Sequence, residues 1–206
     1  MKKDITYHKF PYNNRIESIT PRDANFMAHG IVREYSERGI LVRKQLWKHG
    51  HANGFYREYW GNGELATKGH YLDGKKHGIF WCYDEDGKKQ ERVRFYHGRL
   101  IGGLTQWYPN GKVRVQEKFT WDGKFSSITY YNQKGKRTSW NQVGHMNRIQ
   151  LIKYYDNGKL LVHFDVGKKK ILYCNRKRIK DSVPFLNAHF HSPLEIAEML
   201  DNYNAK

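Results

Sequence analysis

Cysteine is almost absent from this sequence of 206 residues, which has only Cys82 and Cys174. Two distant cysteines form neither a disulfide framework nor a CxxC zinc pattern, and this favours a reducing compartment. No window approaches the ~18 apolar residues of a transmembrane helix, and no apolar signal-peptide core follows Met1. We therefore expect a soluble, intracellular protein, either cytoplasmic or built into a larger particle.

Motifs of catalysis are missing as well. No P-loop, GxGxxG or GxSxG pattern occurs in the sequence. Cys82 has no glycine-rich elbow or helix N-terminus beside it to activate its thiol. The carboxylates from Asp84 to Asp86 fall in an expected turn, where acidic residues favour the turn itself. The sequence thus predicts a protein that is not an enzyme, with no catalytic residue and no cofactor.

Acidic residues are scarce relative to basic ones. The chain has 20 Asp and Glu against 37 Lys and Arg, a formal net charge of +17, which favours nucleic acid, acidic lipid or acidic protein as partners. The densest basic group is the candidate contact site for a polyanion or an acidic partner, and it consists of Lys168, Lys169, Lys170, Arg176, Lys177, Arg178 and Lys180. The alternative interpretation is a run that is simply solvated.

Histidine is frequent, but its spacing does not indicate a metal site. The tightest pair is His189 and His191, which would share one face of an extended segment. A structural zinc site needs four ligands, and two spaced histidines are common by chance. His29 and His77 each precede a glycine of the repeat described next, so we interpret them as turn-flanking residues. The sequence predicts no metal ligand.

Aromatic residues and glycine are abundant, with 15 Tyr, 10 Phe, 6 Trp and 19 Gly, and they recur with a period of about 24 residues, six times between Gly30 and Val166. The units are anchored at Gly30, Gly54, Gly78, Gly102, Ser126 and Ile149. An aromatic column consists of Tyr35, Tyr59, Tyr83, Trp107, Tyr131 and Tyr154. A glycine column follows it with Gly39, Gly63, Gly87, Gly111, Gly135 and Gly158.

Each repeat is predicted to be a β-hairpin. Glycine supplies positive φ at turns, and the pairs Asn62-Gly63, Asp86-Gly87, Asn110-Gly111 and Asn157-Gly158 are typical of two-residue hairpin turns. A second turn is expected at His49-Gly50, Asp73-Gly74 and His97-Gly98, with drift in later units. The fold class is therefore all-β, an elongated antiparallel meander. The aromatic columns are interpreted as cohesion within a thin sheet, in preference to a ligand platform.

The ends of the chain depart from the repeat. Residues 1–28 form an extended arm, an edge strand or a cap, residues 29–168 hold about six repeats, and residues 169–191 hold a basic rim with a degenerate seventh unit. In residues 192–206, Ser192-Pro193-Leu194-Glu195 is a capping box. It predicts a helix from Pro193 to Tyr203 that covers the open end of the sheet.

These columns resemble the MORN repeat family, most clearly in residues 73–87 and 107–113. The resemblance covers residues 30–167 and implies an extended sheet that acts as a non-catalytic scaffold, often dimeric. Such repeats occur in bacteria, eukaryotes and large DNA viruses.

The leading functional hypothesis is accordingly a non-enzymatic scaffold or structural protein that contacts other proteins of an assembly, such as a virus particle, with no small-molecule substrate and with homo-oligomerisation left open. The alternative is a polyanion binder that attaches to nucleic acid or anionic lipid.

Overall fold

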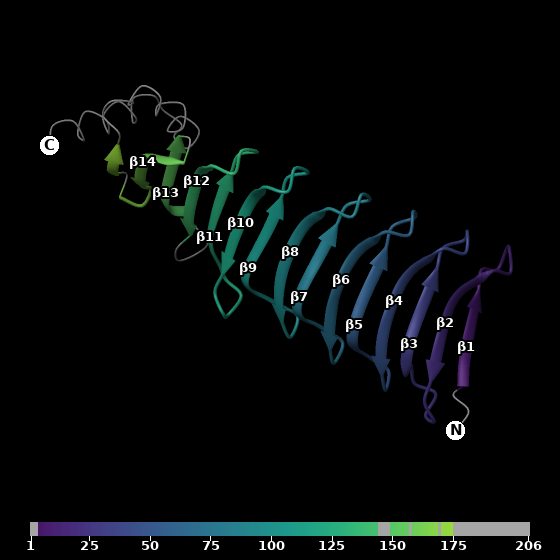
Figure 1. Ribbon diagram of the computed structural model, residues 1–206. Helices are drawn as coiled ribbons and strands as arrows, with labels where there is room; N and C mark the ends of the chain where they lie inside the picture. The colour runs from purple at the N-terminus through teal and green to yellow at the C-terminus, as the bar shows by residue number, and fades with distance from the viewer. Residues whose placement is uncertain (1–3, 144–148, 157, 169, 175–206) are drawn as a thin grey trace. The chain divides into compact units, whose positions relative to one another are not determined.

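The computed structural model describes residues 4–143, 149–156, 158–168 and 170–174. Fifteen antiparallel strands form one open sheet in which strand order follows chain order (Figure 1). The described residues contain no helix, and so none that is long and apolar enough to cross a membrane. The prediction of an all-β antiparallel meander is confirmed. The helix predicted from Pro193 to Tyr203 lies outside the described residues.

The chain packs as two units, which are described separately. The first consists of residues 1–111 with 121–123. Its strands are β1 (Asp4–Lys9), β2 (Ile16–Arg22), β3 (Gly30–Tyr35), β4 (Leu41–Lys48), β5 (His51–Tyr59), β6 (Leu65–Leu72), β7 (Lys75–Tyr83), β8 (Lys89–Tyr96) and β9 (Arg99–Trp107). Within residues 1–28, β1 and β2 pair as a hairpin. The pairs Ser18↔Glu34 and Ile19↔Arg33 join β2 to β3.

The second unit consists of residues 112–120 and 124–206. Its strands are β10 (Val113–Phe119), β11 (Phe125–Tyr131), β12 (Arg137–Val143), β13 (Ile149–Asp156), β14 (Lys159–Asp165) and β15 (Lys170–Cys174). Its most buried side chains are Ile152, Leu161, Val162 and Phe164, each at most 2% exposed. Aliphatic residues therefore form the densest packing of this unit.

The turns at the first glycine column are wider than predicted. In the turn between β3 and β4, Ser36 N donates to Ile40 O and Gly39 N donates to Ser36 O, both at 2.8 Å. Gly39 has φ +80°, and the pairing register shifts between Glu34 and Tyr35, where β3 ends. This arrangement is a type I turn followed by a left-handed glycine bulge.

The prediction of two-residue turns at this column is therefore wrong. A type I′ turn needs positive φ at both central residues, whereas only the glycine has it in Asn62-Gly63, Asp86-Gly87 and Asn110-Gly111. In the loops that begin at Ser36, Asp84 and Asn132, the side chain of the first residue caps backbone N–H groups, which favours the wider loop. Asp84 Oδ1, for example, accepts from Lys88 N at 2.7 Å. Asn157 lies outside the described residues.

Two-residue turns occur instead at the second turn of the first three units, formed by His49-Gly50, Asp73-Gly74 and His97-Gly98. His49, Asp73 and His97 have φ of +46°, +48° and +47°, and the glycine after each also has positive φ. These are type I′ turns, which match the twist of the flanking strands. In the next repeat Thr120 N donates to Lys124 O at 2.8 Å, so that turn has the wider form. The change from a two-residue turn to this wider turn accounts for the shifted position of the turn glycine in the later repeats.

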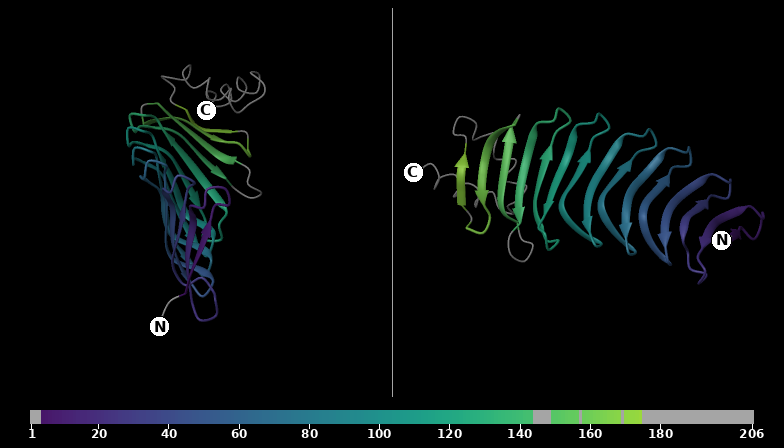
Figure 2. Two further views of the ribbon diagram at one scale, coloured as in Figure 1. Left: turned by 90° about the vertical axis from the view of Figure 1, so that its right-hand side faces the viewer. Right: turned by 60° about the horizontal axis from the view of Figure 1, so that its bottom comes forward.

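The described strands of each unit form a single layer, as the two views in Figure 2 show. Burial in β1 to β9 therefore comes from side chains that pack along one sheet face. Phe80 is 2% exposed and packs against Tyr56, Tyr71 and Phe95, with ring centroids 5.4 to 6.3 Å apart. Both faces of the layer carry side chains that a partner can reach.

Candidate binding surfaces of the sheet

One face of the first unit carries a line of basic residues. Directly paired residues of antiparallel strands point to the same face. The pairings run continuously across β2 to β9 through Ile19, Arg33, Lys44, Arg57, Lys68, Trp81, Arg92 and Thr105. We call Arg33, Lys44, Arg57, Lys68 and Arg92 the basic row. Neighbouring strands are ~4.8 Å apart, so the cations of β3 to β6 follow one another at that spacing. Trp81 of β7 separates Lys68 from Arg92.

The basic row is not neutralised by acidic side chains. None of its five members forms an ion pair with any residue that the structure describes. Arg57 and Lys68 are exposed, and the other three are half-buried. Unpaired cations aligned on one surface create a positive potential that attracts anions.

The acids of β3 to β9 lie in a line on the opposite face. That line runs through Ser18, Glu34, Arg43, Glu58, Thr67, Cys82, Glu91 and Gln106. Its carboxylates are engaged, since Arg43 pairs with Glu34 and Gln106 Nε2 donates to Glu91 at 2.8 Å. The two faces of the sheet therefore differ in charge.

Aromatic rings accompany the cations of the basic row. Arg57 and Lys44 lie 5.9 and 5.8 Å from the centroid of the Phe55 ring, and Arg92 lies 5.8 Å from that of Trp81. Trp81 stacks on Trp107 at 5.7 Å with an interplanar angle of 21°. Cation–π contacts of this kind hold long side chains in place without neutralising them. The face thus combines fixed positive charge with aromatic surface.

The acidic face has a hollow of about 260 Å³. Aromatic and aliphatic side chains such as Tyr71, Phe80 and Leu104 line it together with Cys82, and the charged side chains of Glu58, Lys76 and Glu91 also line it. Burial, followed by the nearby Glu58 carboxylate, raises the pKa of Tyr56 to about 12. Burial, with the charge of Glu91, also raises the pKa of the Cys82 thiol. The thiol is therefore held in its neutral, less nucleophilic form.

The structure describes little of the basic group predicted from the sequence. Lys168 is exposed, and its N–H donates to Asp165 Oδ1 at 3.0 Å. Lys170 begins β15. The other members lie outside the described residues and are Lys169, Arg176, Lys177, Arg178 and Lys180. His189 and His191 also lie outside them.

The repeat columns occupy matching places in the strands. The last residues of β3, β5, β7, β9 and β11 are Tyr35, Tyr59, Tyr83, Trp107 and Tyr131, whereas Tyr154 lies inside β13. The six glycines of the first column have φ from +76° to +89°, and they are Gly39, Gly63, Gly87, Gly111, Gly135 and Gly158. The aromatic column marks the strand end, and the glycine closes the turn that follows.

Sequence reasoning missed the basic row, although the repeat carries its signal. Arg33 and Arg57 each follow an anchor glycine by three residues. Lys44, Lys68 and Arg92 each follow one by fourteen. Reading every column of the repeat for charge, in addition to the aromatic and glycine columns, would have found it.

Each of the two turn-flanking histidines, His29 and His77, lies against a second histidine. The His29 and His49 ring centroids are 4.7 Å apart, and those of His77 and His97 are 5.0 Å apart. In each pair the first residue precedes an anchor glycine and the second begins a type I′ turn. Asp23 joins the first pair through a 2.8 Å contact between its Oδ2 and His49 Nδ1.

Comparisons with known proteins identify no family. No family model matches the sequence, and no curated protein matches it. Among the solved structures that match is a chain of the "Crystal Structure of TcdB2-TccC3-TEV", with 11% identity and a TM-score of 0.23. The match covers 79% of this chain, which spans only 11% of that chain's length. A likeness at this TM-score carries no argument about fold or function.

Proposed function

We propose that the protein is a non-enzymatic scaffold that holds nucleic acid along the basic row of its sheet. The observation that carries this proposal is the alignment of five cations without an ion pair, from Arg33 in β3 to Arg92 in β8. A row of cations on neighbouring strands suits an extended chain of phosphates, because each phosphate that is neutralised releases a counterion. The net charge of +17 adds long-range attraction to the same partner.

Single-stranded nucleic acid fits this face better than a duplex does. Proteins that bind single strands combine a basic surface with aromatic rings on which bases stack. Here Trp81 belongs to the same line of paired residues as the basic row, and Trp107 stacks on it. Both rings are half-buried. The row has no protruding helix or ribbon that would enter a duplex groove among the described residues.

Binding of labelled oligonucleotides tests the proposal. Fluorescence anisotropy with single-stranded DNA and RNA is expected to show binding that Arg57→Gln with Lys68→Gln weakens. The matched control is Arg38→Gln with Lys88→Gln, which removes the same charge from exposed turn positions. Vesicles with anionic lipid form a second arm. Binding to vesicles without binding to oligonucleotides would replace nucleic acid with a membrane surface as the partner, and equal effects of the two double variants would contradict a role for the row.

A second candidate function is contact with proteins of an assembly through the aromatic and aliphatic side chains of the hollow. Tyr71, Phe95 and Leu100 line this hollow and are only half-buried, because the sheet is a single layer. The resemblance of the hairpins to MORN repeats supports this scaffold role, and a virus particle is one such assembly. A protein partner or a second copy of the chain would bind in a salt-resistant manner, since apolar burial drives the contact. Leu100→Glu should abolish that binding, and Thr105→Glu on the basic face should not.

The state of the Cys82 thiol supports the non-enzymatic part of the proposal. Burial raises the pKa of Cys82, and no histidine lines the hollow beside it. Covalent catalysis needs the opposite, a thiol whose pKa is lowered by a base or a positive charge. Turnover of acyl or phosphoryl substrates that Cys82→Ser abolishes would contradict this part.

A further inference from the structure

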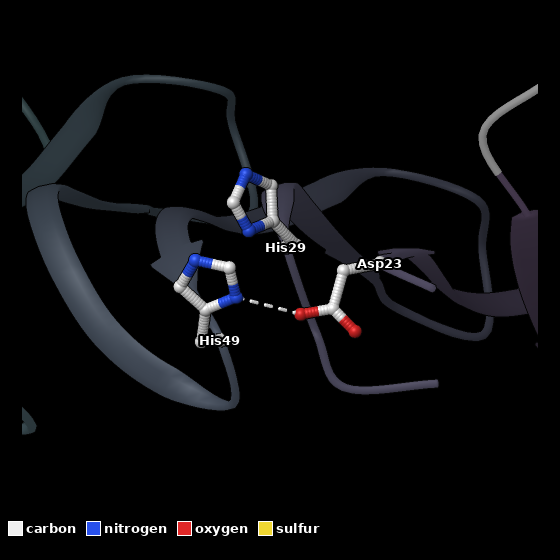
Figure 3. Close-up of side chains that lie close together, drawn as sticks. All are labelled: Asp23, His29 and His49. Carbon is white, nitrogen blue, oxygen red and sulfur yellow. Dashed lines mark hydrogen bonds and ion pairs between the residues drawn. The ribbon is translucent and has the colours of Figure 1, made fainter. Parts of the chain in front are cut away.

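Three side chains from separate segments converge beside the N-terminal hairpin. Asp23 follows β2, His29 precedes β3, and His49 begins the turn between β4 and β5. Each offers one ligand atom, and the three atoms lie within 4.8 Å of one another (Figure 3). Among the described residues this is the one group of three or more metal-ligating side chains at such range.

Backbone hydrogen bonds hold the segments of this cluster in place. Asp23 Oδ1 accepts from Asn25 N at 2.9 Å and from Met27 N at 3.0 Å, which fixes the carboxylate and leaves Oδ2 facing His49. Gly50 N donates to Ala28 O at 2.9 Å, which ties the turn of His49 to the segment of His29. The three ligands are therefore positioned by the fold itself, as a binding site requires.

His29 has a nitrogen atom available for a ligand. His29 Nδ1 is buried and makes no hydrogen bond to any described residue. Figure 3 shows one nitrogen of the His29 ring turned toward the His49 ring. A buried polar atom without a partner destabilises the folded chain. Coordination of a metal ion would satisfy such an imidazole nitrogen.

The carboxylate is ready in its charged form. The hydrogen bond with His49 lowers the pKa of Asp23, and the backbone N–H groups of Met27 and Asn25 lower it further. The carboxylate that faces the histidines therefore favours its ionised form, which is the form that coordinates a metal ion.

We propose that Asp23, His29 and His49 bind a divalent transition metal ion, zinc in particular. Two imidazoles and one carboxylate are ligands that zinc takes readily, and three protein ligands leave a fourth position for water or for a group from a partner. Two residue pairs join β2 to β3, and the ion would add a cross-link between the β1–β2 hairpin and the repeat sheet at this short pairing. The site lies apart from the basic row and does not depend on the proposed function.

The repeat supplies an internal comparison for this site. At the positions equivalent to His29 and His49, the second repeat has Asn53 and Asp73, joined by a 2.9 Å hydrogen bond. The third repeat has His77 and His97, whose rings are 5.0 Å apart, without a third metal-ligating side chain in range. A pair of histidines thus recurs, and Asp23 distinguishes the first pair.

Zinc titration of the full-length protein tests the proposal. After treatment with a chelator, calorimetry with zinc chloride at neutral pH should show one equivalent bound. His29→Asn, His49→Asn and Asp23→Asn should each weaken binding at least tenfold, whereas the matched control His97→Asn should leave it unchanged. At a hundredfold excess of zinc over its dissociation constant, the melting temperature should rise by roughly 5 °C or more, and this rise should disappear in the Asp23 variant.

Cobalt(II) substitution provides a readout that does not depend on stability. The wild-type spectrum should show ligand-field bands that Asp23→Asn changes, and circular dichroism without metal should show that the variants are folded. The proposal is overturned if no stoichiometric zinc is bound, if His97→Asn weakens binding as much as His49→Asn does, or if His189→Asn with His191→Asn abolishes binding while Asp23→Asn does not.

Discussion

Gly69 of β6 lies directly under the ring of Phe80, so that a β-carbon added at Gly69 would be 2.4 Å from Phe80 Cδ1. The absence of a side chain at Gly69 is what allows the ring to lie flat on the neighbouring strand. Phe80 is thereby 2% exposed although the sheet is a single layer. Close approach of a ring to a backbone substitutes here for the second layer that buries side chains in most β folds.

Gly69→Ala should lower the free energy of unfolding by about 1–3 kcal/mol, because the methyl group forces the Phe80 ring out of its position. Gly61→Ala is the matched control, since no atom lies within 4 Å of a β-carbon placed there and neither glycine has positive φ. Urea denaturation of both variants measures the difference. Equal stability of the two variants would show that Phe80 does not pack on Gly69.

Asp84→Ala should destabilise the turn between β7 and β8. Asp84 Oδ1 accepts from Lys88 N at 2.7 Å and from Asp86 N at 3.1 Å, and the alanine variant loses both hydrogen bonds. The expected cost is about 0.5–1.5 kcal/mol in urea denaturation. Asp84→Asn keeps an acceptor oxygen and should retain most of the stability, so equal losses in the two variants would contradict this account of the turn.

Stability should fall as the pH rises from about 10 to about 12. Burial raises the pKa of Tyr56 and that of Tyr154 to about 12, whereas the ordinary value is 10.0. The unfolded chain then loses these protons at lower pH than the folded one, so its population grows as the pH increases. Thermal melts across this range, with phenolate absorbance as a second reading, check the sign. A melting temperature that does not change over the range would contradict the burial of these two phenols.

The hairpin architecture could be predicted from the sequence because its determinants are local. Positive φ at turn glycines such as Gly39 and alternating aromatic residues act within a few positions of the chain. The turn type at Asn62-Gly63 was predicted wrongly because the dipeptide alone does not reveal the cap. Asn62 Oδ1 accepts from Glu64 N at 2.9 Å, which suits a wider loop.

Neither candidate site is apparent within a single segment, because both depend on register. The line from Arg33 to Arg92 depends on the register of every strand pair from β3 to β8. Bulges such as the one between Cys82 and Tyr83 set these registers. Likewise, Asp23 and His49 are 26 positions apart, and only the turn contact brings them together. Long-range pairing of this kind has no signature within a single segment.

The salt dependence of oligonucleotide binding tests the central claim most directly. For single strands the slope of log K against log salt is about −0.7 per phosphate neutralised, so the five cations of the basic row should contribute about −3.5. Arg57→Gln with Lys68→Gln should reduce the magnitude of the slope by about 1.4, and Arg38→Gln with Lys88→Gln should leave it nearly unchanged. A slope that both double variants alter equally, or binding that does not respond to salt, would contradict the assignment of the basic row as the nucleic-acid surface.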